Sequence, residues 1–131
     1  MIYLDSSALV KLVIDESESA ELERWIGAPE PGQLVSSDLA RVEVARACRR
    51  GHHQAISAAR DLLAGLDLLP LTFTLLGEAA EVGDPRLRTL DAVHLASALS
   101  IREDLSAFVA YDSRLSDAAA AAGLPCVAPG A

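Results

Sequence analysis

The feature of this sequence that most limits its fold is a regular alternation of short apolar segments with stretches of helical periodicity. Short apolar runs separated by turns and helical patterns are typical of central strands in a parallel sheet. The expected strands are residues 2–4, 34–35, 66–71, 107–111 and 125–127. The alternation therefore predicts an α/β fold in which about five mostly parallel strands lie between two layers of helices.

The helices are expected in the connections between these strands. The segments with helical spacing of apolar residues are 17–27, 39–50, 54–65, 74–82, 87–102 and 113–122. Gly51 and Gly123 follow two of these segments, as glycine often does at a helix C-terminus. Residues 29–32 contain Pro and Gly and are expected to form a turn. The short connections and the length of 131 residues predict a single domain spanning residues 1–131.

The composition limits the cellular compartment and the class of ligand that we expect for such a domain. Cys48 and Cys126 are far apart and match no metal-binding spacing, so neither a disulfide framework nor a zinc site is expected. No signal-like segment and no long apolar run occurs, which predicts a soluble cytoplasmic protein without membrane contact. The net charge of −8 argues against a general nucleic-acid binder. It is compatible with a nuclease whose metal ions meet the phosphates.

Two aspartates follow predicted strands. Asp5 comes after residues 2–4 and Asp112 after residues 107–111, and a helical pattern follows each of them. Folds of this type bind ligands beyond the carboxyl ends of their strands, so the two positions predict a shared site. Each aspartate would also serve well as a helix N-cap, and this alternative stays open.

Two further acids lie on the apolar sides of predicted helices. Glu43 is one turn from Leu39 and from Ala47, and Asp91 shares a helical face with Leu95. A carboxylate on a core-facing stripe is costly unless a positive group pairs with it. Mg²⁺ and Mn²⁺ prefer carboxylate oxygens, and such ions activate water for attack on phosphodiesters. The four acids together therefore favour a site for divalent cations over four separate structural roles.

The segments around these acids resemble one nuclease family across nearly the whole chain. They are IYLDSSALVKL from Ile2, LARVEVARA from Leu39, LRTLDAVHLASAL from Leu87 and FVAYDSRLSDAAAAAGL from Phe108. In this combination they resemble the PIN-domain ribonucleases, and among those the VapC toxins of bacterial toxin–antitoxin pairs. The resemblance implies a three-layer α/β/α sandwich, a metal-dependent endoribonuclease and an RNA substrate. It further implies a homodimer and inhibition by a cognate VapB-like antitoxin.

The resemblance also implies a catalytic and metal-binding role for each acid. Asp5 and Asp91 match the family's main ligands for Mg²⁺ or Mn²⁺. Glu43 matches an acid that ligates the metal or orders its water, and Asp112 matches the fourth acid. Asp117, roughly one helical turn later, is the alternative to Asp112 or a neighbour that supports it.

Residues beside the acids have two interpretations each. Ser7 resembles the family's small hydroxyl residue, which would orient a carboxylate or contact phosphate, while Ser6 is a candidate N-cap. Arg88 and Arg114 would either grip phosphates of the RNA or balance the carboxylate charge. For His94, a packing or hydrogen-bonding role is favoured over acid catalysis or metal ligation.

Two other functions compete with the ribonuclease at this stage. A phosphatase of the haloacid-dehalogenase type also places an aspartate after its first strand. Its pattern requires a second aspartate two residues later, where this chain has Ser7. A non-catalytic PIN-like domain that binds RNA or protein for regulation is the other alternative, and the presence of all four acids disfavours it.

Overall fold

In the computed structural model, which describes residues 1–28 and 32–131, five strands form one sheet. They are β1 (Ile2–Leu4), β2 (Leu34–Ser37), β3 (Asp67–Leu69), β4 (Ala107–Val109) and β5 (Cys126–Val127). Their order is β3-β2-β1-β4-β5, and every neighbouring pair is parallel. The predicted α/β fold is confirmed, with a sheet that is parallel throughout. The turn predicted at residues 29–32 lies almost entirely outside the described residues.

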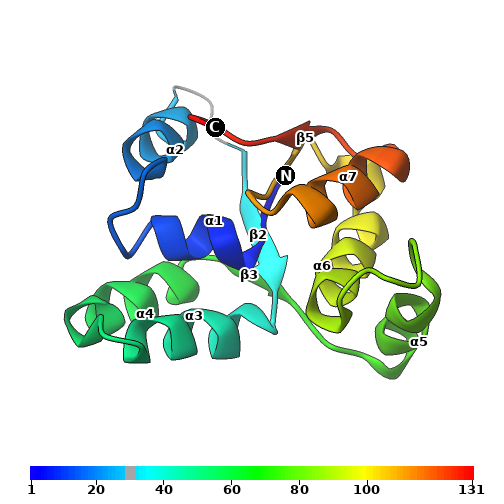
Figure 1. Cartoon of the computed structure of the whole chain (residues 1–131), viewed down its shortest axis with the longest axis horizontal. Helices are drawn as coiled ribbons and strands as arrows, with labels where there is room; N and C mark the ends of the chain where they lie inside the picture. Colours follow the sequence, from blue (N-terminus) through cyan, green and yellow to red (C-terminus); the bar gives the residue numbers. More distant parts are fainter. Residues whose placement is uncertain (29–31) are drawn as a thin grey trace.

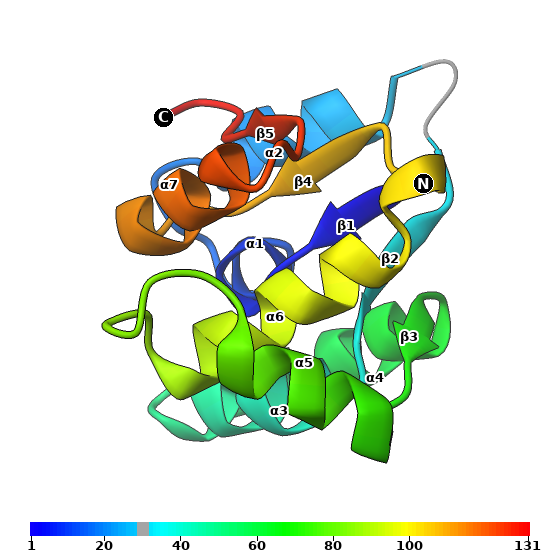
Figure 2. The same ribbon diagram turned by 90° about the vertical axis from the view of Figure 1, so that its right-hand side faces the viewer.

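Helices connect the strands and cover both faces of the sheet (Figure 1 and Figure 2). They are α1 (Ser6–Lys11), α2 (Ser19–Ile26), α3 (Ala40–Arg49), α4 (Ile56–Ala64), α5 (Phe73–Glu81), α6 (Thr89–Ser100) and α7 (Ser113–Ala121). Two short 3-10 helices, His53–Ala55 and Arg102–Asp104, complete the described elements. Helices α1 to α4 pack on one face, α6 and α7 pack on the other, and α5 packs against α6. This arrangement is the predicted three-layer sandwich.

The strands send alternate side chains into the two helical layers. Ile2 and Leu4 belong to the core beneath α1 to α4, whereas Tyr3 between them belongs to the core beneath α6 and α7. In β4, Val109 belongs to the first core and Phe108 to the second. Successive strand residues point to opposite faces, so a sheet covered on both faces needs apolar residues at every position. This explains why the central strands appear in the sequence as unbroken apolar runs.

Element boundaries differ from the predicted ones by a few residues, for local reasons. Helix α6 begins at Thr89 rather than at residue 87 because Arg88 has an extended backbone, with φ −64° and ψ 149°. Helix α5 begins after Thr72, whose hydroxyl accepts a hydrogen bond from the Leu75 amide. Strand β3 ends before Pro70, which has no N–H to donate to a sheet ladder. Within the described residues, no helix combines the length and the apolar character needed to cross a membrane.

The sheet has a switch point between β1 and β4. From β1 the chain runs outward to β2 and β3, and it later returns to β4 on the other side of β1. The helices that make the connections on the two sides cover opposite faces of the sheet. Folds of this kind bind ligands beyond the carboxyl ends of the strands at the switch point. Asp5 follows β1 there, and Asp112 follows β4.

Candidate active site

Asp5 lies at the carboxyl end of β1 and is only 3 % exposed. Its Oδ1 accepts hydrogen bonds from the Ala8 amide at 3.0 Å and from the Ser7 hydroxyl at 2.6 Å. Asp5 is therefore the N-cap of α1, and the interpretation of Ser6 as that cap is wrong. Burial raises the pKa of Asp5 above its usual value, the two hydrogen bonds oppose this shift, and the charge of Asp91 adds to it.

Ser7 joins the ends of β1 and β4. Its hydroxyl donates to Asp5 and accepts a hydrogen bond from the Tyr111 amide at 3.1 Å. The Asp5 amide in turn donates to the Val109 carbonyl at 3.1 Å. These bonds hold the residues after the two strands at one edge of the sheet. The contact with Asp5 also gives Ser7 the geometry to orient that carboxylate.

Glu43 is held from two sides, with 17 % of its side chain exposed. Its Oε1 lies 2.6 Å from His94 Nε2, and its Oε2 accepts a hydrogen bond from the Ser6 hydroxyl at 3.1 Å. His94 is buried, and its Nδ1 lies 2.8 Å from the Tyr3 hydroxyl. The predicted hydrogen-bonding role of His94 is confirmed. Ser6, considered only as a helix cap in the sequence, contacts one of the acids instead.

Tyr3 anchors this chain of contacts in the core. Its ring is fully buried and stacks on Phe108 with the centroids 5.4 Å apart, and it meets the His94 ring edge-on at 5.9 Å. Burial raises the pKa of the Tyr3 hydroxyl well above its usual value of 10.0, so the hydroxyl keeps its proton. Tyr3 was not among the functional residues predicted from the sequence. Its one signal was a polar aromatic residue inside an otherwise aliphatic strand.

Arg88 bridges the other two acids. Its Nε lies 3.4 Å from Asp91 Oδ2, and its Nη2 lies 3.2 Å from Asp112 Oδ2. The remaining oxygen of Asp112 accepts hydrogen bonds from the amides of Arg114 and Leu115, so Asp112 is the N-cap of α7. The guanidinium supplies the positive charge that a half-buried carboxylate at Asp91 requires.

Ion pairs, hydrogen bonds and charges relate the acids at the carboxyl edge of the sheet to one another, but the acids do not form a preformed metal-binding cluster. The charge of Asp91 acts on Asp5, and Arg88 joins Asp91 to Asp112. Glu43 is joined through His94 to α6, the helix that also carries Asp91. Among the described residues, no group of three or more His, Cys, Asp or Glu side chains is placed to hold a metal ion.

A pocket of about 590 Å³ opens beside Glu43, between α1 and α3. Ser6, Ser7 and Glu43 form the part of its wall nearest the sheet edge. We call this pocket the α1–α3 cleft. It offers a solvent-accessible approach to Glu43.

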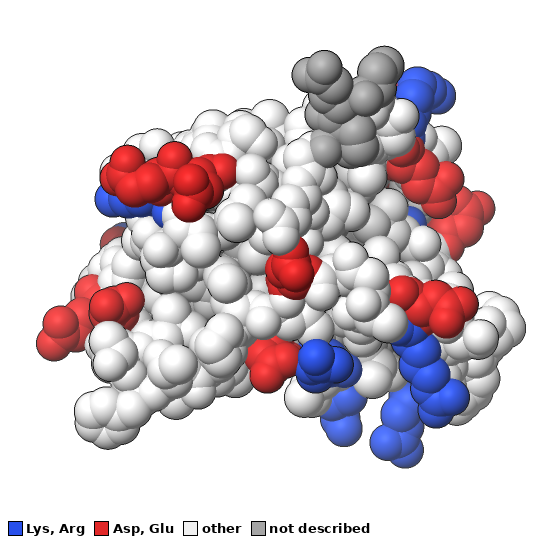
Figure 3. Space-filling model, turned by 180° about the vertical axis from the view of Figure 1, so that it is seen from behind, with Lys and Arg blue, Asp and Glu red and all other residues white. Residues whose placement is uncertain are grey.

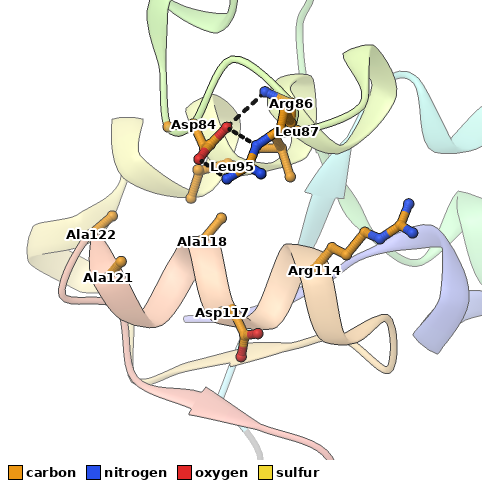
Figure 4. A pocket seen from close by; sticks show the side chains of 10 residues that line it. Asp84, Arg86, Leu87, Leu95, Arg114, Asp117, Ala118, Ala121 and Ala122 are labelled. Carbon is orange, nitrogen blue, oxygen red and sulfur yellow. Dashed lines mark hydrogen bonds and ion pairs between the residues drawn. The ribbon is translucent and has the colours of Figure 1, made fainter.

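A larger pocket of about 950 Å³ lies between α7 and the loop before α6 (Figure 4). Its walls include Leu87, Leu95 and the ion pair of Asp84 with Arg86. Asp117 borders this pocket, and its carboxylate points away from the ion pair (Figure 4). Asp117 thus lines the larger pocket, whereas Glu43 lines the α1–α3 cleft.

The sequence matches the PIN domain over residues 2–121, nearly the whole chain. The chain belongs to the PIN-domain family. Two similar curated proteins of this family come from Mycobacterium tuberculosis. Ribonuclease VapC47 of strain CDC 1551 / Oshkosh is 46 % identical over 135 residues, which cover 100 % of this chain and 98 % of the relative. Ribonuclease VapC46 of strain ATCC 25618 / H37Rv is 45 % identical over 128 residues, with 98 % and 97 % covered.

Solved structures with low sequence identity share the same PIN fold. Mycobacterium tuberculosis VapC20, described as a sarcin-ricin loop cleaving toxin, aligns with a TM-score of 0.77 at 23 % identity and covers 98 % of this chain and 100 % of its own. FitAB bound to an IR36 DNA fragment aligns with a TM-score of 0.73 at 14 % identity, with 100 % and 96 % covered. VapBC2 of Rickettsia felis, bound to a promoter DNA fragment, aligns with a TM-score of 0.69 at 12 % identity, with 98 % and 99 % covered.

Proposed function

We propose that this PIN-domain protein is a metal-dependent endoribonuclease and the toxin of a VapBC-type toxin–antitoxin pair. The observation that carries the proposal is that Asp5 and Asp112 follow β1 and β4 at the switch point, while Arg88 pairs with both Asp112 and Asp91. Glu43 pairs with His94 of α6, the helix that carries Asp91. Full-length relatives named ribonuclease VapC support the choice of RNA as substrate. Family membership replaces the haloacid-dehalogenase alternative.

The donor set suits Mg²⁺ or Mn²⁺. All four acids offer carboxylate oxygens, which these ions prefer. Mg²⁺ keeps several waters and needs only one or two carboxylates, so it does not require a preformed cage of three side chains. Asp5 provides the physical reason for a cation at this edge, because its carboxylate is buried and the negative charge of Asp91 adds to the resulting rise of its pKa. A bound cation would offset both the lost hydration and the repulsion.

The acids would then have separate tasks. Asp5 and Asp91 would hold the cation, which when bound lowers the pKa of water and stabilises charge on the phosphate. Glu43 uses one acceptor site on each oxygen for His94 and Ser6. An ionised carboxylate has about four such sites, so both oxygens of Glu43 can still accept from a water molecule. Glu43 would therefore orient the attacking water and take its proton.

The partners follow from the same family assignment. Structures of VapBC2 and FitAB support a VapB-like antitoxin as the protein that inhibits this chain. A homodimer is the assembly that we expect for the toxin, because closed two-fold dimers are the commonest soluble oligomers. We place the active protein in the cytoplasm.

RNA cleavage by the purified protein tests this function. Wild-type protein is expected to cut RNA with Mg²⁺ or Mn²⁺ and to stop in excess EDTA. Asp91→Asn is expected to lower the rate by orders of magnitude while the protein melts at the wild-type temperature or above. Asp61→Asn is the matched control, since it removes the same charge from an exposed position on α4 that has no assigned role in the site. Undiminished cleavage in EDTA, or by Asp91→Asn, would contradict the proposal and favour the non-catalytic alternative.

A further inference from the structure

The α1–α3 cleft carries positive charge next to the proposed catalytic edge. Besides Glu43, its charged lining residues are Lys11, Glu16, Arg46 and Arg50. Lys11 is neutralised within the protein, because its Nζ lies 3.3 Å from Glu16 and 2.8 Å from a second glutamate. Arg46 and Arg50 are exposed, and within the described residues neither forms an ion pair. The cleft therefore presents two guanidinium groups without an internal counter-ion.

The two arginines lie in line with Glu43. Arg46 is three residues after Glu43 on α3, and Arg50 is the C-cap residue that directly follows the helix. With a rise of about 1.5 Å per residue, Arg46 and Arg50 are about 6 Å apart along the helix axis. All three residues line the α1–α3 cleft, so a ligand that follows the cleft from Glu43 toward the C-terminus of α3 meets one guanidinium after the other. Several positively charged side chains gather on the side of the molecule that α3 and α4 occupy (Figure 3).

The chemistry of the cleft matches a polyanion that also has an apolar side. Guanidinium groups bind phosphate oxygens with two parallel hydrogen bonds. Val10, Leu39, Val42 and Leu90 form the apolar wall of the same cleft, and two of them are about half exposed, Val42 at 57 % and Leu90 at 49 %. Such a wall suits sugar and base faces of a nucleotide. None of the described residues that line the cleft is aromatic, so base stacking is not provided and the contacts would position the strand without reading its sequence.

We propose that Arg46 and Arg50 form a phosphate subsite that binds the single-stranded RNA flanking the scissile bond. The inference rests on the proposed ribonuclease function and adds the path of the substrate along α3. The chain has a net charge of −8, so its overall electrostatic field repels RNA. The two arginines of this subsite would attract the RNA phosphates locally.

RNA binding by a non-cleaving protein tests the subsite. All proteins carry Asp91→Asn, and the affinity for a short fluorescent single-stranded oligoribonucleotide is measured at several salt concentrations. The double change Arg46→Gln with Arg50→Gln is expected to weaken binding and to lower the salt slope by about 1.4, because each phosphate contact on a single strand contributes about 0.7. The control double change is Arg41→Gln with Arg49→Gln, which removes two charges from the same helix outside the cleft. This control is expected to leave the slope nearly unchanged.

The possible results separate the subsite from the proposed function. An equal loss of slope in both double variants, or no loss in either, would overturn the subsite. If instead the cleft variant binds RNA normally but loses affinity for an acidic antitoxin peptide, the cleft belongs to a protein partner and the subsite is also overturned. If RNA binding depends on Arg46 and Arg50 while the wild type never cleaves with Mn²⁺, the subsite stands and the nuclease function fails.

Discussion

His94 Nε2 lies 2.6 Å from Glu43 Oε1, behind the acidic edge of the sheet. Because an ionised carboxylate only accepts hydrogen bonds, Nε2 is the donor in this pair. The other ring nitrogen lies 2.8 Å from the Tyr3 hydroxyl, which donates to it when the imidazole is neutral. Glu43 thus selects the tautomer of His94 that carries its proton on Nε2, and the contact with His94 fixes the rotation of the Glu43 carboxylate.

Replacing His94 by Gln or by Asn tests its contact with Glu43 separately from its contact with Tyr3. The longer side chain of His94→Gln carries an N–H near the position of Nε2, whereas the shorter one of His94→Asn reaches only the position of Nδ1. We expect His94→Asn to cleave RNA about 10- to 100-fold more slowly than wild type, the usual effect of losing a residue that orients a site. His94→Gln is expected to recover most of the rate. Equal rates in two variants with equal melting temperatures would show that the contact with Glu43 does not matter.

Arg88 lies between Asp91 and Asp112, where it competes with any cation for their oxygens. Its side chain is 60 % exposed, so Arg88→Gln is expected to change the unfolding free energy by less than about 1 kcal/mol. The same change is expected to tighten Mn²⁺ binding, measured by calorimetric titration. Arg86→Gln is the control, because Arg86 pairs with Asp84 instead. Weaker Mn²⁺ binding in Arg88→Gln alone would show that the guanidinium supports the metal site.

Asp5→Asn measures the cost of burying a carboxylate at this edge. The pKa of Asp5 is raised in the folded protein above its usual 3.8, so the folded state holds this proton more tightly than the unfolded state. Stability therefore falls as pH rises through the interval between the two pKa values, and the penalty persists at neutral pH. Asparagine carries no charge and still caps the helix.

Without metal, Asp5→Asn is accordingly expected to melt above wild type at pH 7. The difference is expected to vanish when the pH falls below the usual pKa of an aspartate. Thermal melts across this range check the prediction, with the exposed Asp15→Asn as control. A variant that melts below wild type at neutral pH would mean that the charge of Asp5 stabilises the fold.

Phe73, the first residue of α5, is 95 % exposed, and Leu76 one turn later is 48 % exposed. A second copy of the chain that covered this surface would remove apolar area from water. We therefore expect light scattering to give a dimer for wild type and a smaller mass for Phe73→Ser. Leu90→Ser, which removes an exposed apolar side chain elsewhere, is expected to stay dimeric. A monomer mass for wild type at every concentration would refute the dimer.

Much of the fold is visible in the sequence because the sheet is buried on both faces. Strands such as β1 and β4 appear as apolar runs, and the acids that follow them lie at the edge where α/β folds bind ligands. The helical acids Glu43 and Asp91 were also detectable, because each interrupts an apolar stripe.

The contacts around those acids were not visible in the sequence, for a physical reason. Tyr3, Glu43 and His94 come from β1, α3 and α6, and no local pattern encodes a contact between elements so far apart in the chain. Likewise, Arg88 and Arg114 both flank an acid in the sequence. The extended backbone of Arg88 allows its side chain to bridge two carboxylates, while Arg114 contributes its amide to a helix cap.

Asp112 divides its two oxygens between structure and function, which predicts a milder effect of its substitution. Oδ1 accepts hydrogen bonds from the Arg114 and Leu115 amides at 2.9 Å and 3.1 Å, so only Oδ2, shared with Arg88, is free to face a cation or its waters. Asp112→Asn keeps the cap and is expected to slow RNA cleavage about 10- to 100-fold, less than Asp91→Asn. Asp112→Ala also loses the cap, and its unfolding free energy is expected to fall by about 1 kcal/mol. Cleavage rates and melting curves of these variants distinguish the two contributions. If Asp112→Asn melts like wild type yet cleaves as slowly as Asp91→Asn, Asp112 holds the metal directly.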